Sequence, residues 1–106
     1  MKTYIVTTKE ENIIAGIFTT ENDKKAMYEA FTGWELTLGV TFIEFVTSHR
    51  VQRLKSLDGL NVNIHGLDMP EEAFDDYDEF DGGRLNVDKL KEHIKERKKE
   101  GYYNEQ

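Results

Sequence analysis

The sequence predicts an α+β domain, in which a small, largely antiparallel sheet carries one packed helix and a second, peripheral helix lies at the C-terminus. Three observations lead to this fold class. Two runs of β-branched and aromatic residues open the chain, a capped apolar stripe with helical spacing follows them, and a second capped helical segment comes last. The 106 residues, of which 38% are apolar, fit a single domain over residues 1–106 with one modest core.

The N-terminal runs are expected to form a β-hairpin with strands at residues 3–8 and 13–19. Both runs are rich in residue types that favour strands, and the polar residues 9–12 between them suit a turn. Gly16 lies within the second run, where a glycine indicates either a bulge or a close approach to the backbone.

A helix is expected over residues 23–32, packed on the sheet. Thr20 or Asn22 provides its N-cap, and Gly33 is expected to end it. Its apolar stripe consists of Ala26, Met27, Ala30 and Phe31.

Residues 41–57 fit two descriptions. Residues 40–47 are rich in β-formers, which favours a strand there, followed by a short basic helix at residues 49–57. The alternative is one helix from about Thr41 to Leu57, because several side chains also recur at helical spacing. These are Ile43, Val46, Arg50, Leu54 and Leu57. We adopt the strand followed by the helix.

A further strand is expected at residues 60–65, where apolar and polar residues alternate after the Asp58-Gly59 turn signal. Pro70, the only proline, suits the first position of a short helix that continues to Tyr77.

The last helix is expected over residues 87–100, between the N-cap Asn86 and the terminating Gly101. Its apolar stripe is limited to Val87, Leu90 and Ile94. We therefore expect this helix to bury little surface and to lie at the periphery.

The net charge of −7 belongs to one segment, residues 68–83. This acidic segment contains eight acidic and no basic residues, so the remaining chain, with 14 basic and 13 acidic residues, carries +1. Phe74, Tyr77 and Phe80 recur every three residues among the acids. The segment is either a solvated linker whose aromatic residues attach it to the core or a binding surface.

Catalytic and metal chemistry find no support in the sequence. The chain has no cysteine, and His49, His65 and His93 lie too far apart for a paired ligand motif. An EF-hand loop that starts at Asp76 would place Val87 where the bidentate glutamate belongs. We therefore expect no enzyme activity, no catalytic residues, no metal and no cofactor.

The absence of cysteine suits a reducing compartment, and no stretch reads as a signal peptide or a transmembrane helix. A cytoplasmic protein without membrane contact is therefore expected.

The opening of the chain resembles that of a group of small bacteriophage-encoded proteins. The residues that carry the resemblance are Tyr4-Ile5-Val6-Thr7-Thr8, Ile13-Ile14-Ala15-Gly16-Ile17-Phe18-Thr19-Thr20 and Lys25-Ala26. They match a ββα opening that is common in these proteins, most of which have no assigned function, and they cover about the first 32 residues. The resemblance implies a phage or prophage origin and hence the cytoplasm of a bacterial host, and it transfers no functional residue.

The acidic segment supports a functional hypothesis of protein binding. A row of carboxylates with aromatic anchors can imitate the phosphates of nucleic acid and occupy a basic surface of a host protein, such as a nucleic-acid-binding enzyme. An anti-restriction or anti-CRISPR-like inhibitor would act in this way. The predicted partner-binding residues are Asp68, Glu71, Glu72, Phe74, Asp75, Asp76, Tyr77, Asp78, Glu79, Phe80 and Asp81.

Three alternatives remain open. In the first, the protein is a structural or regulatory module in which the acidic segment is only a linker. In the second, it binds nucleic acid weakly through Arg50, Arg53 and the C-terminal helix. The interleaved acids of that helix argue against direct nucleic-acid binding. In the third alternative, opposite charge blocks pair head to tail between copies.

Overall fold

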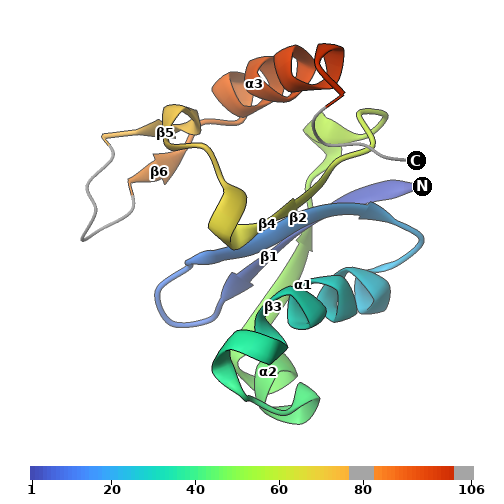
Figure 1. The fold of residues 1–106 in the computed structure, drawn as a ribbon, viewed down its shortest axis with the longest axis vertical. Helices are drawn as coiled ribbons and strands as arrows, with labels where there is room; N and C mark the ends of the chain where they lie inside the picture. Colours follow the sequence, from blue (N-terminus) through green and yellow to red (C-terminus); the bar gives the residue numbers. More distant parts are fainter. Residues whose placement is uncertain (77–82, 102–106) are drawn as a thin grey trace.

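The computed structural model describes residues 1–76 and 83–101, and within these it leaves aside the side chains of residues 34–38. Four strands form an antiparallel sheet in the order β3-β1-β2-β4 (Figure 1). The strands are β1 (Lys2–Thr8), β2 (Ile14–Thr20), β3 (His49–Arg53) and β4 (Asn63–His65). Helices cover both faces of this sheet, which confirms the α+β fold class.

The predicted hairpin is confirmed, and Gly16 has both of the expected roles. The register shifts between Val6 and Thr7, which face Gly16 and Ile14, so a bulge lies at this point of β2. A Cβ atom on Gly16 would lie only 2.3 Å from the ring of Phe18. The glycine therefore makes room for an aromatic ring of the core.

Helix α1 (Asp23–Leu38) is longer than predicted and passes through Gly33. Its start at the N-cap Asn22 is confirmed by a 2.9 Å bond from the backbone N–H of Lys25. A Cβ atom at position 33 would lie 2.3 Å from Nδ1 of His65, so this glycine accommodates a side chain of β4 and does not end the helix. The chain leaves the helix at Gly39, whose φ is +67°.

The prediction for residues 40–57 is wrong in its order, because the helix comes before the strand. Helix α2 (Phe42–Ser48) starts with a capping box, in which Thr41 Oγ1 accepts a bond from the backbone N–H of Glu44 at 3.2 Å and the Glu44 carboxylate accepts one from the N–H of Thr41 at 2.9 Å. Strand β3 then begins at His49. The β-forming residues of α2 are tolerated because the cap and the burial of Phe45 favour the helix.

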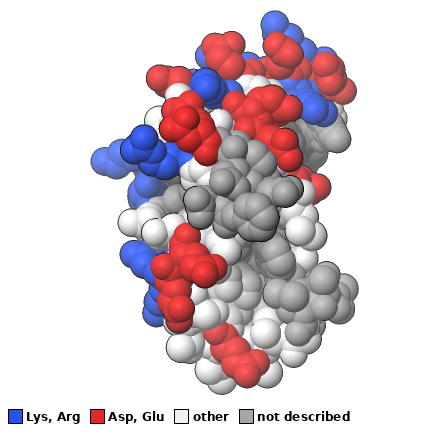
Figure 2. Space-filling view, turned by 90° about the vertical axis from the view of Figure 1, so that its left-hand side faces the viewer, with Lys and Arg blue, Asp and Glu red and all other residues white. Residues whose placement is uncertain are grey.

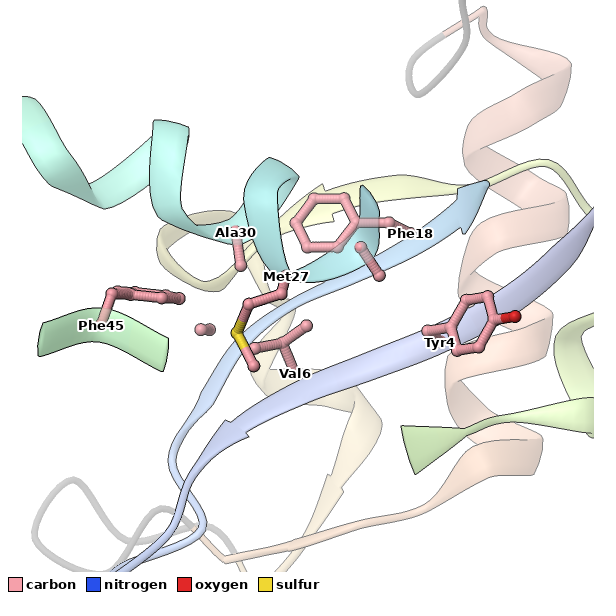
Figure 3. Close-up of a cluster of buried hydrophobic side chains, with 8 residues drawn as sticks. Tyr4, Val6, Phe18, Met27, Ala30 and Phe45 are labelled. Carbon is pink, nitrogen blue, oxygen red and sulfur yellow. The ribbon is translucent and has the colours of Figure 1, made fainter. Parts of the chain in front are cut away.

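The first hydrophobic core lies between the sheet and the α1–α2 layer. Figure 3 shows Met27 and Ala30 of α1 and Phe45 of α2 pointing towards Val6 of β1. The buried members are Tyr4, Val6, Ala15, Phe18, Ala26, Met27, Ala30 and Phe45. The predicted stripe of the first helix is thus confirmed as a core face, with Phe31 packed at its margin.

A second hydrophobic core fills the opposite face of the sheet, under helix α3 (Val87–Lys99). The cap at Asn86 and the end at Gly101 are confirmed. The expectation that this helix buries little is wrong, because Leu90 and Ile94 are both fully buried. Seven buried residues form this core, namely Ile17, Leu57, Val62, Ile64, Ala73, Leu90 and Ile94.

The segment that starts at Pro70 forms a 3₁₀ turn, Glu71–Ala73, in place of the longer helix that was expected. Strand β5 (Phe74–Asp75) follows and pairs with β6 (Arg84–Leu85). The predicted helix end at Tyr77 lies outside the described residues. No helix in the described part of the chain has the length and apolar character to span a bilayer.

His49 lies at the junction of α2 and β3, with its ring stacked on Phe45 at a centroid distance of 3.8 Å. Burial lowers the pKa of His49, and a bond between its Nδ1 and the Phe45 carbonyl opposes that change less strongly. The folded protein therefore prefers the neutral ring. As pH falls below about 6.5, the unfolded chain takes up the proton first, so stability decreases.

This pH dependence is tested by urea unfolding between pH 7.5 and pH 5.5, on the wild type and on His49→Gln. We expect the wild type to lose stability over this range and the variant to lose less. Equal slopes for the two proteins would show that His49 does not carry the effect.

Candidate partner-binding cleft

The structure divides the predicted binding residues into three groups. Tyr77, Asp78, Glu79, Phe80 and Asp81 lie outside the described residues. Phe74 and Asp75 contribute to the fold. The remaining acids, Asp68, Glu71, Glu72 and Asp76, are exposed.

Asp75 connects the β5–β6 hairpin to α3. Its carboxylate accepts a bond from Lys89 Nζ at 2.8 Å and another from Asn86 Nδ2 at 3.0 Å. The bonds from Lys89 and Asn86 hold the pKa of Asp75 below its usual value. Phe74 packs half-buried against the second core and lies opposite Leu85. These two residues therefore attach the start of the acidic segment to the domain.

A cleft of about 510 Å³ is lined by the first part of the acidic segment and by α3. Asp68, Glu71 and Glu72 form one wall, because the chain makes two successive 3₁₀ turns on either side of Pro70. The other wall is one face of α3, where His93 and Arg97 are four residues apart. Asn63, Ile64 and Pro70 complete the lining.

The carboxylates of the cleft differ in their contacts. Asp68 and Glu71 are exposed and have no hydrogen bond or ion pair within the described chain. Glu72 is 77% exposed, and its Oε1 lies 3.9 Å from Nδ1 of His93, whose side chain is only 16% exposed. This distance is longer than a hydrogen bond, so the two groups do not form an acid–base pair in this conformation. The cleft therefore presents solvated negative charge beside a partly buried imidazole.

Figure 2 shows how charge is distributed over one side of the molecule. Acidic and basic side chains are interleaved around α3 at the top, and charged side chains become fewer towards α2 at the bottom. Helix α3 thus lies at the end of the molecule where charged side chains are numerous, and α2 lies at the other end.

The basic residues proposed for direct nucleic-acid binding have structural contacts. Arg53 forms a bidentate pair with Asp58 at 2.8 and 2.9 Å, and this pair holds the pKa of the carboxyl well below its usual range. Arg50 donates a 2.8 Å bond to the carbonyl of Lys9 in the β1–β2 turn. Both arginines therefore have contacts within the fold, and the basic residues of the C-terminal helix lie on α3, across the sheet from α2.

His93 and Arg97 are the cleft residues that sequence reasoning missed. Their spacing of four residues on the predicted C-terminal helix was the available signal, but nothing in the sequence indicated which residues would face them. The ring of His65 lies against Gly33, and its Nδ1 is buried without a hydrogen-bond partner in the described structure. Among the described residues, no group of three or more acidic or histidine side chains is placed to hold a metal ion.

A comparison of the chain with protein families, with curated protein sequences and with solved structures finds no match.

Proposed function

We propose that the protein acts by binding a basic surface of another protein, with the acidic cleft wall as the contact that guides the approach. The observation that carries this proposal is the position of Asp68 and Glu71, which line a cleft and have no hydrogen-bond or ion-pair partner among the described residues. Carboxylates that are not neutralised internally attract cationic side chains over a distance and accelerate encounter. The half-buried ring of Pro70 adds an apolar part to the lining, which suits the methylene stem of an arginine or lysine.

In its more specific form, the proposal is a phage-type accessory or inhibitor protein in the host cytoplasm. Its partner would be a host enzyme that handles nucleic acid, because such enzymes hold phosphates with lysine and arginine and so present the basic grooves that an acidic surface fits. No catalytic step is part of this function.

A structural or regulatory module is the second candidate. The attachment of Asp75 to Lys89 and Asn86 favours it, since this acid stabilises the fold and is not available to a partner. In that case the acidic cleft would only be solvated surface.

The two candidates are distinguished by the double variant Asp68→Asn/Glu71→Gln. A matched control, Glu11→Gln/Glu29→Gln, removes the same charge from exposed positions away from the cleft. Partners are captured from a bacterial lysate, and association rates are then measured with the purified partner at low and moderate salt. We expect the cleft variant to associate roughly three- to tenfold more slowly, with the difference decreasing as salt rises, because the lost attraction is long-range.

The control variant should associate at close to the wild-type rate. Equal losses in both variants would indicate that only net charge matters. Wild-type binding by the cleft variant would favour the structural module.

A further inference from the structure

Strand β3 is an edge of the four-stranded sheet, and one side of its backbone is unpaired in the described structure. The bonds that flank the β1–β3 ladder fix which side this is: Leu54 N–H donates to Thr3 O, and Lys9 N–H donates to Ser48 O, both at 2.9 Å. Hydrogen-bonded pairs recur at every second residue of an antiparallel ladder. The backbone groups of Arg50 and Gln52 therefore also bond to β1. The outward N–H and C=O groups then belong to His49, Val51 and Arg53.

We propose that this edge pairs with β3 of a second copy of the same chain, giving a two-fold symmetric dimer with a continuous eight-stranded sheet. The strand is self-complementary when Val51 lies opposite Val51 of the second copy. In this register the outward groups of His49, Val51 and Arg53 face one another as hydrogen-bonded pairs, so all five residues of β3 are used.

The side chains also fit this register. Arg50 faces the partner's Gln52, and both residues are exposed on the same face of the sheet. His49 faces the partner's Arg53, whose charge is already balanced by Asp58 at 2.8 Å. No two uncompensated like charges are directly opposite, which is the arrangement that would oppose pairing.

The surface beside the edge supports the same conclusion. Seven large apolar side chains are exposed in the described structure, and four of them, Tyr28, Phe42, Ile43 and Val46, lie on α1 and α2. Helix α2 leads directly into β3, and its only charged residue, Glu44, caps the helix. Charged side chains near an edge strand oppose edge-to-edge pairing; α2 adds none beyond that capped carboxylate, so the charges at this edge are those of β3 itself, Arg50 and the Asp58-paired Arg53.

Position 52 offers a test in both directions. Each symmetric dimer contains the Arg50–Gln52 contact twice, so Gln52→Glu creates two opposite-charge pairs and Gln52→Arg creates two like-charge pairs. From the usual strength of such cross-strand pairs, we expect the dimer dissociation constant to fall roughly 2- to 30-fold with Glu and to rise by a similar factor with Arg. Sedimentation equilibrium over a concentration series measures this constant, which is expected to be in the weak range because the strand is short.

Two further variants complete the test. Asn63→Glu and Asn63→Arg make the same charge changes on β4, the opposite edge of the sheet, and should leave dimerisation at the wild-type level. Val51→Pro removes an outward N–H without removing a bond to β1, so it should abolish the dimer while circular dichroism still shows a folded monomer.

The pairing would be established if the dimer dissociation constant shifts in opposite directions for the two Gln52 variants and keeps the wild-type value for both Asn63 variants. The proposal is overturned if the wild type remains monomeric up to millimolar concentration, if Gln52→Glu and Gln52→Arg have equal dissociation constants, or if β3 pairs only with a strand of a different protein.

Discussion

Replacing Phe45 with alanine is expected to lower the free energy of unfolding by about 3–5 kcal/mol. Phe45 is 2% exposed and is the only buried residue of α2. Its ring contacts Phe31 edge-on at a centroid distance of 5.7 Å and stacks on His49 at 3.8 Å. Truncation therefore leaves a cavity at one end of the first core and removes the contacts that hold α2 against the sheet.

Urea unfolding of the purified variant measures this loss. Ile43→Ala is the matched control, since Ile43 lies on the same helix and is 78% exposed. Its effect should stay within about 0.5 kcal/mol. A loss below about 1 kcal/mol for Phe45→Ala, or equal losses for the two variants, would mean that α2 is not anchored by this ring.

Replacing Ile94 with alanine is expected to cost about 2–5 kcal/mol. Ile94 is fully buried and, with Leu90, forms the face of α3 that covers the second core. The effect is large only because α3 packs on the sheet; a peripheral helix would tolerate the change. Lys95→Ala, at the next and exposed position, should be close to neutral.

Chemical denaturation followed by tryptophan fluorescence and by circular dichroism would measure the loss and show whether the two cores unfold together. A single transition at the same midpoint for both signals is expected, because β1 and β2 separate the cores and are shared by them. If Ile94→Ala produced no loss of stability, α3 would not be part of the cooperative unit.

The hairpin and the C-terminal helix could be predicted from the sequence because their signals are local. Alternation, a polar turn and Asn or Gly caps specify these elements within a few residues. The segment from Thr41 to Arg53 could not be ordered in this way. The β-forming residue types favour a strand at residues 40–47, whereas the helical spacing of Ile43 and Val46 and the capping box at Thr41 and Glu44 favour a helix there.

Other features of the fold could not be predicted because they depend on contacts between residues that are distant in the sequence. Gly33 appears as a helix terminator when it is considered alone, and only the ring of His65 explains its position within α1. The burial of Leu90 depends on a surface assembled from residues as far apart as Ile17 and Ala73. By contrast, the concentration of acidic residues around Asp68 was enough to predict that these side chains would be exposed.

The fold also determined the boundary of the candidate site. It is the packing of α3 that places His93 and Arg97 opposite the acids and so forms a cleft. It also places Asp75, one acid of the same segment, against Lys89. Sequence alone could not separate the acids that face a cleft from the acid that stabilises the hairpin.

The pairing of Phe74 with Leu85 and of Asp75 with Arg84 has a consequence for how this protein can diversify. The two ends of the intervening stretch are held side by side by the hairpin and by the bond that Lys89 donates to Asp75. Doubling the length of a closed loop costs only about 0.6 kcal/mol, so the entropy of loop closure sets little restriction on the length of the connection between β5 and β6. A change in the length of this connection is therefore compatible with keeping β5 paired with β6 and Asp75 bonded to Lys89.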